Sequence, residues 1–290
     1  MTNAICIGGF MAETIHIERG SVQETLIIPL YGRKLCAEQF SNLYQDEYAG
    51  KICDSIDYDF TDLEKKKNSS MYQFGGLESA MRELDMIWEI NDYLKIYPTA
   101  AVVNLGCGLN MTGRTADNGQ CYIYNLEFPE AIKSRNEMIP AGEREENISC
   151  DLNDFEWMDR IDGTGGAIFY AAGVFHYFTT DQIKSMVTTL AERFPGGRII
   201  FDTVGKFGRD VLMKGTLKNL GMNDISGLFC IDYKEELEGW SDKVKLATRR
   251  SYMQGYYPLE DPNVKGIHRF LAKLCDSLAK MYINRMEFVK

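Results

Sequence analysis

Residues 101–110 read AVVNLGCGLN, and this stretch decides the fold. An apolar run ends in two glycines one residue apart, which is typical of a buried strand that runs into a tight turn. Two such glycines let the backbone pass close to a bound nucleotide, where a side chain would collide. The sequence therefore predicts that Gly106 and Gly108 open a nucleotide-binding crevice at the end of a strand.

An acidic residue follows the glycines at the distance typical of a ribose ligand. Glu127 comes nineteen residues after Gly108, at the end of the apolar run 122–126. A carboxylate in this position commonly accepts hydrogen bonds from ribose hydroxyls. A dinucleotide fingerprint would place a third glycine at position 111, which is Met111, so a nicotinamide-dependent dehydrogenase is disfavoured. The pattern favours S-adenosylmethionine, which carries adenosine but no phosphates.

Bulk composition describes an acidic globular protein. The chain has 290 residues, of which 45% are hydrophobic, and a formal net charge of −10, so we expect one large α/β domain or one domain with a cap. No basic stretch exceeds Lys65–Lys67, which disfavours nucleic acid as a main partner. No run of 18 apolar residues predicts a membrane span, and residues 1–17 lack the basic start of a signal peptide. We expect a cytoplasmic protein, a monomer or a homodimer.

Cysteine and histidine usage argues against a metal centre. The eight cysteines are scattered without a Cys-x-x-Cys pair, and none of the three histidines clusters with them. We interpret the cysteines as reduced thiols, several of them small core residues, and we expect no metal site.

The chain is organised as a helical segment followed by alternating strands and helices. Residues 1–97 are expected to be mainly helical, without strand alternation, and to form a cap that builds the substrate pocket of the same domain, while residues 98–290 form the cofactor-binding core. The alternation predicts a Rossmann-like α/β fold, a seven-stranded and mostly parallel sheet with helices on both faces. Strands are expected at 100–105, 121–126, 146–150, 166–172, 197–203, 244–252 and 281–289, and helices at 77–95, 111–117, 129–138, 154–160, 180–194 and 263–280. The segment 25–33 is expected to enter a helix, and 57–60 to form a loop.

The residues just after the strands are the candidate cofactor ligands, because open parallel sheets bind ligands at the carboxyl ends of their strands. Asp151 is placed to accept from an adenine amino group while Leu152 packs on the ring; alternatively, Asp151 caps the helix expected at 154 or is a solvated loop carboxylate. The full candidate set is Asn104, Gly106, Cys107, Gly108, Glu127, Phe128, Asp151, Leu152 and Ala172.

Taken together, these motifs resemble the leucine carboxyl methyltransferase family. This class I S-adenosylmethionine-dependent family includes protein phosphatase carboxyl methyltransferases and tetracenomycin-type polyketide O-methyltransferases. The resemblance covers roughly residues 24–288 and implies the class I methyltransferase fold, with Gly106 and Gly108 near the methionine part of the cofactor. The matching segments are 102–109 (VVNLGCGL), 126–132 (LEFPEAI), Asp151–Leu152 and 173–178 (GVFHYF).

Three positions depart from the family pattern. Asn110 stands where the family usually has aspartate, and Ala172 stands where it has a glutamate near the methionine end of the cofactor. Ala80 occupies the position of an arginine that often grips the cofactor carboxylate, and Arg82 or Arg33 is the candidate substitute. A catalytically degenerate, cofactor-binding member is therefore an alternative to an active enzyme.

Methyl transfer is an in-line displacement, so the enzyme mainly has to hold the nucleophile and the methyl group aligned. A hydroxyl acceptor benefits from a base, whereas a carboxylate acceptor needs only an anchor. His176 and Tyr177 are the candidate catalytic residues, although His176 could instead pack as a helix-start residue. Tyr31 and Arg33 are the candidate substrate-binding residues.

The sequence thus predicts an S-adenosylmethionine-dependent O-methyltransferase that acts on a hydroxyl or carboxyl group of a small molecule. A protein carboxyl methyltransferase is the alternative within the enzyme class, and a non-catalytic cofactor-binding protein is the alternative outside it.

Overall fold

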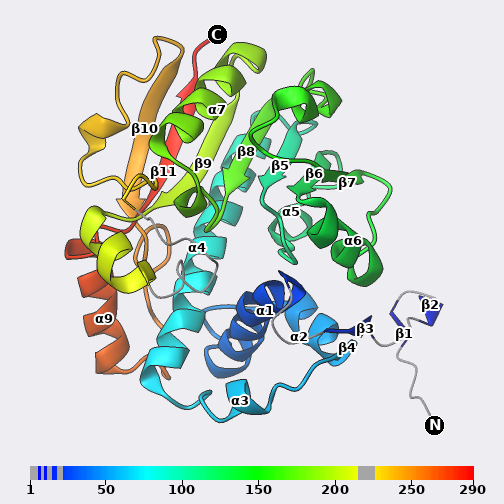
Figure 1. The fold of residues 1–290 in the computed structure, drawn as a ribbon, viewed down its shortest axis with the longest axis vertical. Helices are drawn as coiled ribbons and strands as arrows, with labels where there is room; N and C mark the ends of the chain where they lie inside the picture. The colour runs from blue at the N-terminus through cyan, green and yellow to red at the C-terminus, as the bar shows by residue number, and fades with distance from the viewer. Residues whose placement is uncertain (1–5, 8–9, 12–14, 18–21, 215–225) are drawn as a thin grey trace.

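The computed structural model describes residues 6–7, 10–11, 15–17, 22–214 and 226–290. Its main sheet has seven strands in the order β10-β11-β9-β8-β5-β6-β7 (Figure 1). Strands β5 to β9 pair in parallel, and β11 is antiparallel to both of its neighbours. The predicted seven-stranded, mostly parallel sheet is confirmed. The strands are β5 (Ala101–Leu105), β6 (Tyr122–Glu127), β7 (Glu145–Ser149), β8 (Ala167–Ala171), β9 (Arg198–Thr203), β10 (Val244–Ser251) and β11 (Tyr282–Phe288).

Helices cover both faces of the sheet, as expected. Along β5, Val103 joins the core cluster that contains helix α7 (Thr180–Arg193), whereas Val102 joins the cluster built on α4 (Ser70–Leu94) and α9 (Gly266–Ser277). This alternation follows from the two-residue period of a strand. In Figure 1, α7 lies in front of the sheet and α4 runs behind it.

The connecting helices follow the expected positions with two corrections. Helix α6 (Pro129–Met138) begins with proline at its first turn, and α5 (Thr112–Thr115) is a single turn. Residues Phe155–Arg160 form a 3₁₀ helix where an α-helix was expected. Helix α4 begins at Ser70, ahead of the expected start at 77, because the Ser69 side chain accepts a hydrogen bond from the Tyr72 amide. The remaining turns are the 3₁₀ segments Phe175–Tyr177 and Lys234–Glu236 and the π-helical segment Gly208–Met213.

The N-terminal third is mainly helical, as expected, and it also contains four two-residue strands. Short strand pairs join β1 (Cys6–Ile7) to β2 (Phe10–Met11) and β3 (Ile15–His16) to β4 (Ile56–Asp57). Asp57, expected in a loop, therefore pairs with His16. Residues 1–5, 8–9, 12–14 and 18–21 lie outside the described residues. The helices here are α1 (Val22–Gln39), α2 (Glu47–Asp54) and α3 (Thr61–Glu64).

Helix α1 lies next to the end of β5 (Figure 1). The Leu26 side chain on α1 approaches Gly108, and the Arg33 side chain donates to the carbonyl of Leu109 at 3.1 Å. The helical segment thus contacts the glycine loop directly.

The described ranges contain no helix that is long and apolar enough to cross a membrane. The same part of the chain contains no group of three side chains arranged to hold a metal ion. As predicted for core residues, most of the described thiols are buried: Cys36, Cys53, Cys107, Cys121 and Cys275.

Candidate active site

The glycine loop occupies the point where the strand order reverses. The chain leaves β5 toward β6 and β7 on one side and returns to β8 and β9 on the other, so a crevice opens between the ends of β5 and β8. Gly106 has φ +73°, and a Cβ there would lie 2.5 Å from Cγ2 of Val174. Gly108 has φ +45°. At Gly106, both backbone conformation and space therefore require glycine.

Glu127 is bound to this loop through the backbone. Its Oε2 accepts from the Gly108 amide at 3.2 Å, and its Oε1 accepts from the Phe128 amide at 3.1 Å. Burial raises the pKa of Glu127, although these two amides oppose the shift. The side chain remains partly exposed, so the carboxylate can accept further hydrogen bonds at the edge of the crevice.

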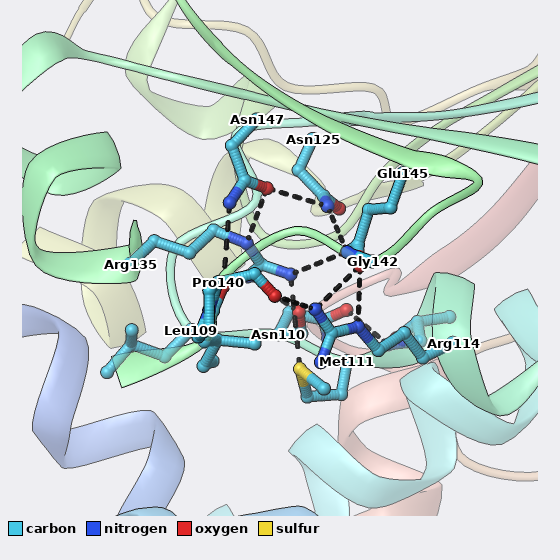
Figure 2. Close-up of polar contacts among 12 residues, drawn as sticks. Leu109, Asn110, Met111, Arg114, Asn125, Arg135, Pro140, Gly142, Glu145 and Asn147 are labelled. Atoms are coloured by element: carbon cyan, nitrogen blue, oxygen red, sulfur yellow. Dashed lines mark hydrogen bonds and ion pairs between the residues drawn. The ribbon is translucent and has the colours of Figure 1, made fainter. Parts of the chain in front are cut away.

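Arg135 on α6 supports the loop by hydrogen bonds to its carbonyls (Figure 2). Its guanidinium is 1% exposed and donates through Nη1 to the carbonyls of Gly108 at 2.9 Å and Asn110 at 2.8 Å. Its Nε donates to Oδ1 of Asn147 at 3.2 Å, and Glu145 Oε1 lies 3.7 Å from Nη2. Sequence analysis missed this residue. The available signal was its spacing from Ala131 and Ile132, which places it on the buried face of α6.

The departure at Asn110 leaves the turn intact. Its Oδ1 accepts from the Thr112 amide at 2.8 Å and so satisfies a free amide at the start of α5. An aspartate would make the same contact, because both side chains present an acceptor oxygen at this position.

The residues expected around adenine follow β7 and β6. Asp151 is exposed and accepts from the Asn153 amide at 2.9 Å, whereas Asp154 caps the 3₁₀ helix by accepting from the Glu156 amide. The alternative of Asp151 as that helix cap was therefore wrong, whereas its exposed position agrees with the alternative of a solvated loop carboxylate. Leu152 is buried, and Phe128 is 51% exposed.

Two more candidates lie beneath the loop at the end of β5. Cys107 is buried, and its amide donates to the carbonyl of Leu126. Among the described polar atoms, Nδ2 of Asn104 is buried without a hydrogen-bond partner. A ligand acceptor atom would satisfy this amide group.

On the other side of the crevice, three segments meet at Asp202, at the end of β9. Arg82 Nη1 lies 3.2 Å from Asp202 Oδ2, and His176 Nε2 lies 3.1 Å from the same oxygen. The Gly173 amide donates to Oδ1 at 2.7 Å. Burial alone would raise the pKa of Asp202, but Arg82 and His176 hold it well below its usual range. A Cβ at Gly173 would lie 2.6 Å from Arg82 Nη1, so the glycine makes room for the guanidinium.

The candidate catalytic residues differ in accessibility. His176 is buried, and within the described structure its Nδ1 has no hydrogen-bond partner. Tyr177 is 38% exposed and lies within electrostatic range of Arg82, Asp202 and Glu127. Tyr177 is thus the more accessible of the two. Their catalytic roles stay predictions.

The two candidate substrate-binding side chains bind other residues of the protein. Arg33 is buried and pairs with Asp46 at 3.0 Å and Glu83 at 3.5 Å. Tyr31 is buried, stacks on the ring of Phe60 and donates its hydroxyl to Glu64. Their role in substrate binding stays a prediction. Arg33 and Arg82 were also the candidates for gripping the cofactor carboxylate, and of these two only Arg82 reaches the ends of β8 and β9.

Comparisons with known proteins agree with this architecture. The tetracenomycin polyketide synthesis O-methyltransferase of Streptomyces glaucescens is 26% identical over 196 residues, 67% of this chain and 69% of the relative. An S-adenosyl-L-methionine-dependent methyltransferase of Gibberella zeae is 23% identical over 271 residues, 88% of this chain and 89% of the relative. A candidate methyltransferase structure from Thermobifida fusca aligns with TM-score 0.56 and 14% identity, over 89% of this chain and 94% of that one.

The class I methyltransferase fold predicted from the sequence is thereby confirmed, and the similarity places the chain among S-adenosylmethionine-dependent methyltransferases. No family model matches the chain, so the narrower family name stays a prediction.

Proposed function

We propose that this chain is an S-adenosylmethionine-dependent O-methyltransferase that modifies a hydroxyl or carboxyl group of a small molecule. The observation that carries the proposal is the Glu127 carboxylate bound to the Gly108 amide at the strand-order reversal. The cofactor supplies a methyl group activated by a sulfonium. The relative from Streptomyces glaucescens, named for a polyketide O-methyltransferase, supports a small-molecule acceptor.

The residues of the crevice fit this cofactor. Gly106 leaves space that a Cβ would fill, and the unpartnered Nδ2 of Asn104 offers a donor below the loop. We assign the ribose hydroxyls to Glu127, which keeps a partly exposed carboxylate. We assign adenine to the exposed Asp151 and the buried Leu152 that follow β7.

The acceptor site is assigned to the opposite side of the crevice. Burial raises the pKa of the Tyr177 phenol, so this group stays protonated at neutral pH and donates a hydrogen bond to the acceptor oxygen. The segment 1–97 is assigned to the pocket wall, because its helix α1 contacts Gly108 and Leu109.

The test is titration calorimetry with S-adenosylmethionine and S-adenosylhomocysteine. Glu127→Ala is expected to weaken both ligands at least about tenfold, because two ribose hydrogen bonds to a charged group are lost. The matched control is Glu137→Ala, an exposed acid on α6. Unchanged affinity in a folded Glu127→Ala protein would remove the ribose assignment.

A further inference from the structure

Glu78 is an acidic residue to which the proposed function assigns no role. It lies on α4 one turn before Arg82, so both side chains emerge from the same side of the helix. Its Oε1 accepts a hydrogen bond from Sγ of Cys275 on α9 at 3.6 Å. Its carboxylate is also within electrostatic range of Arg82 and Tyr252. Glu78 therefore belongs to the polar groups beside the ends of β8 and β9.

Glu78 changes the net charge of the polar groups around Arg82. Arg82 and Asp202 form a pair at 3.2 Å and cancel each other. Burial raises the pKa of Tyr252 and of Cys275, so both stay uncharged at neutral pH. The ionisation of Glu78 therefore adds one negative charge to this described cluster, beside the Asp276 carboxyl group that also lies within electrostatic range of Cys275.

The cluster lies at the β8 end of the crevice. Gly173, two residues after the end of β8, packs against the Arg82 guanidinium. A negative charge here attracts a sulfonium cation and has no such effect on a neutral thioether. Because Arg82 and Asp202 cancel each other, ionised Glu78 supplies such a charge.

We propose that Glu78 supplies, from α4, a negative charge at the β8–β9 side of the crevice, and that it thereby favours S-adenosylmethionine over S-adenosylhomocysteine. The inference rests on the proposed function. It concerns the binding of the methionine part of the cofactor, whereas the assignment of Glu127 concerns the binding of its ribose.

The charge of Glu78 changes near neutral pH. Burial raises the pKa of the Glu78 carboxyl to about 7, against the opposing effects of the Cys275 thiol and the Arg82 cation. The carboxylate gains its charge as pH rises through this value, so preference for the cation should increase from pH 6 to pH 8. The groups that face it are Arg82 on α4, Cys275 on α9 and Tyr252 after β10. Asp202 of β9, which His176 also contacts, lies behind Arg82, and Asp276 of α9 lies next to Cys275.

The experiment is calorimetric titration of the full chain with each ligand at pH 6 and pH 8. For the wild type, the ratio of the S-adenosylhomocysteine Kd to the S-adenosylmethionine Kd should be about fivefold higher at pH 8. Glu78→Gln should abolish this rise by lowering the pH 8 ratio, and Glu78→Asp should restore most of it. Because Glu78→Gln carries no titrating group at this position, it also corrects for titration of the ligands themselves.

Glu137→Gln is the control for a change of net charge far from the crevice, and it should keep the wild-type ratios. If Glu78→Gln weakens both ligands by the same factor, or neither, Glu78 has a structural role and the inference is overturned while the proposed function stands. If the folded wild type binds neither ligand, the proposed function fails, and the inference fails with it. Should Glu78→Gln not fold, the wild-type pH arm and Glu78→Asp still decide, and a wild-type ratio that does not change with pH overturns the inference.

Discussion

On the β5–β6 side of the crevice, charged side chains mainly bind the backbone, whereas on the β8–β9 side they mainly bind one another. Glu127 and Arg135 hold the glycine loop through its amides and carbonyls. Arg82 and His176 instead converge on the carboxylate of Asp202, which also accepts from the Gly173 amide. The first arrangement fixes the path of the chain at the proposed ribose end, and the second places charged groups at the proposed methionine end.

The β5–β6 side therefore determines the shape of the glycine loop, and the β8–β9 side determines the local charge. Substitutions on the β5–β6 side should change stability and cofactor binding together, because the loop itself moves. Substitutions on the β8–β9 side should discriminate between ligands that differ in charge. The following predictions test that division, beginning with the largest expected effect.

Gly106→Ala should have the largest effect on stability and cofactor binding. The new Cβ would lie 2.5 Å from Val174, and φ is +73°. We expect the free energy of unfolding to fall by about 2–5 kcal/mol, the sum of crowding and left-handed strain, and cofactor binding to be lost. Urea unfolding and calorimetry measure the two effects.

Gly119→Ala is the control for strain alone, because φ is +80° and a Cβ there meets no atom within 4 Å. It should lose about 1–2 kcal/mol of stability and keep its cofactor affinity. Equal losses in the two variants would contradict the crowding at Gly106.

Arg135→Met should have the next largest effect. It leaves the carbonyls of Gly108 and Asn110 without their buried donor, at a loss of about 1–3 kcal/mol in unfolding free energy. Glu145 keeps Arg114 at 2.6 Å, which limits the damage. Cofactor affinity should fall in parallel. The exposed Arg160→Met, which breaks only the pair with Glu146, should change stability by less than about 1 kcal/mol.

A smaller effect concerns pH and helix α4, which carries the charged side of the crevice. Asp85 is fully buried; it accepts from the Tyr256 amide, and its Oδ2 is without a partner among the described residues. Burial raises the pKa of Asp85 to about 7, above its ordinary value of 3.8. The folded protein therefore binds this proton more tightly, and the associated stability is lost as pH rises from about 4 through 7.

Asp85→Asn should remove this part of the pH dependence. Thermal unfolding of the variant should show a smaller loss of stability between pH 5 and pH 8 than the wild type shows. An unchanged pH profile would mean that Asp85 stays ionised in the folded protein.

The strands could be predicted closely because β-sheet and helix periods alternate clearly after residue 100. The expected start of α4 at 77 was too late, because the Ser69 cap starts the helix at Ser70 and Gly75 and Gly76 lie inside it. The structure shows why Gly76 is tolerated: a Cβ there would approach the carbonyl oxygen of Gly32 on α1 to 3.1 Å. Close packing of two helices outweighs the low helix propensity of glycine.

The residues on the β5–β6 side of the crevice could be predicted from the sequence better than those on the β8–β9 side. The glycines and Glu127 lie within one strand–turn–strand unit, so their proximity follows from spacing. Arg82 and Asp202 are 120 residues apart, and only the packing of α4 across the sheet brings them together. The burial of Arg33 and Tyr31 could not be foreseen either, because their partners come from distant turns of the N-terminal segment.

The placement of α4 has a consequence for synthesis on the ribosome. Translation completes this helix at Leu94, but the strands β8 and β9 that it packs against are complete only when residue 203 has been added. Until then its apolar side has no sheet to cover, and such exposed surface promotes aggregation of nascent chains. We therefore expect the emerging N-terminal helices to be a binding site for chaperones, and a ribosome-bound chain arrested before β8 to be more sensitive to protease than one arrested after β9.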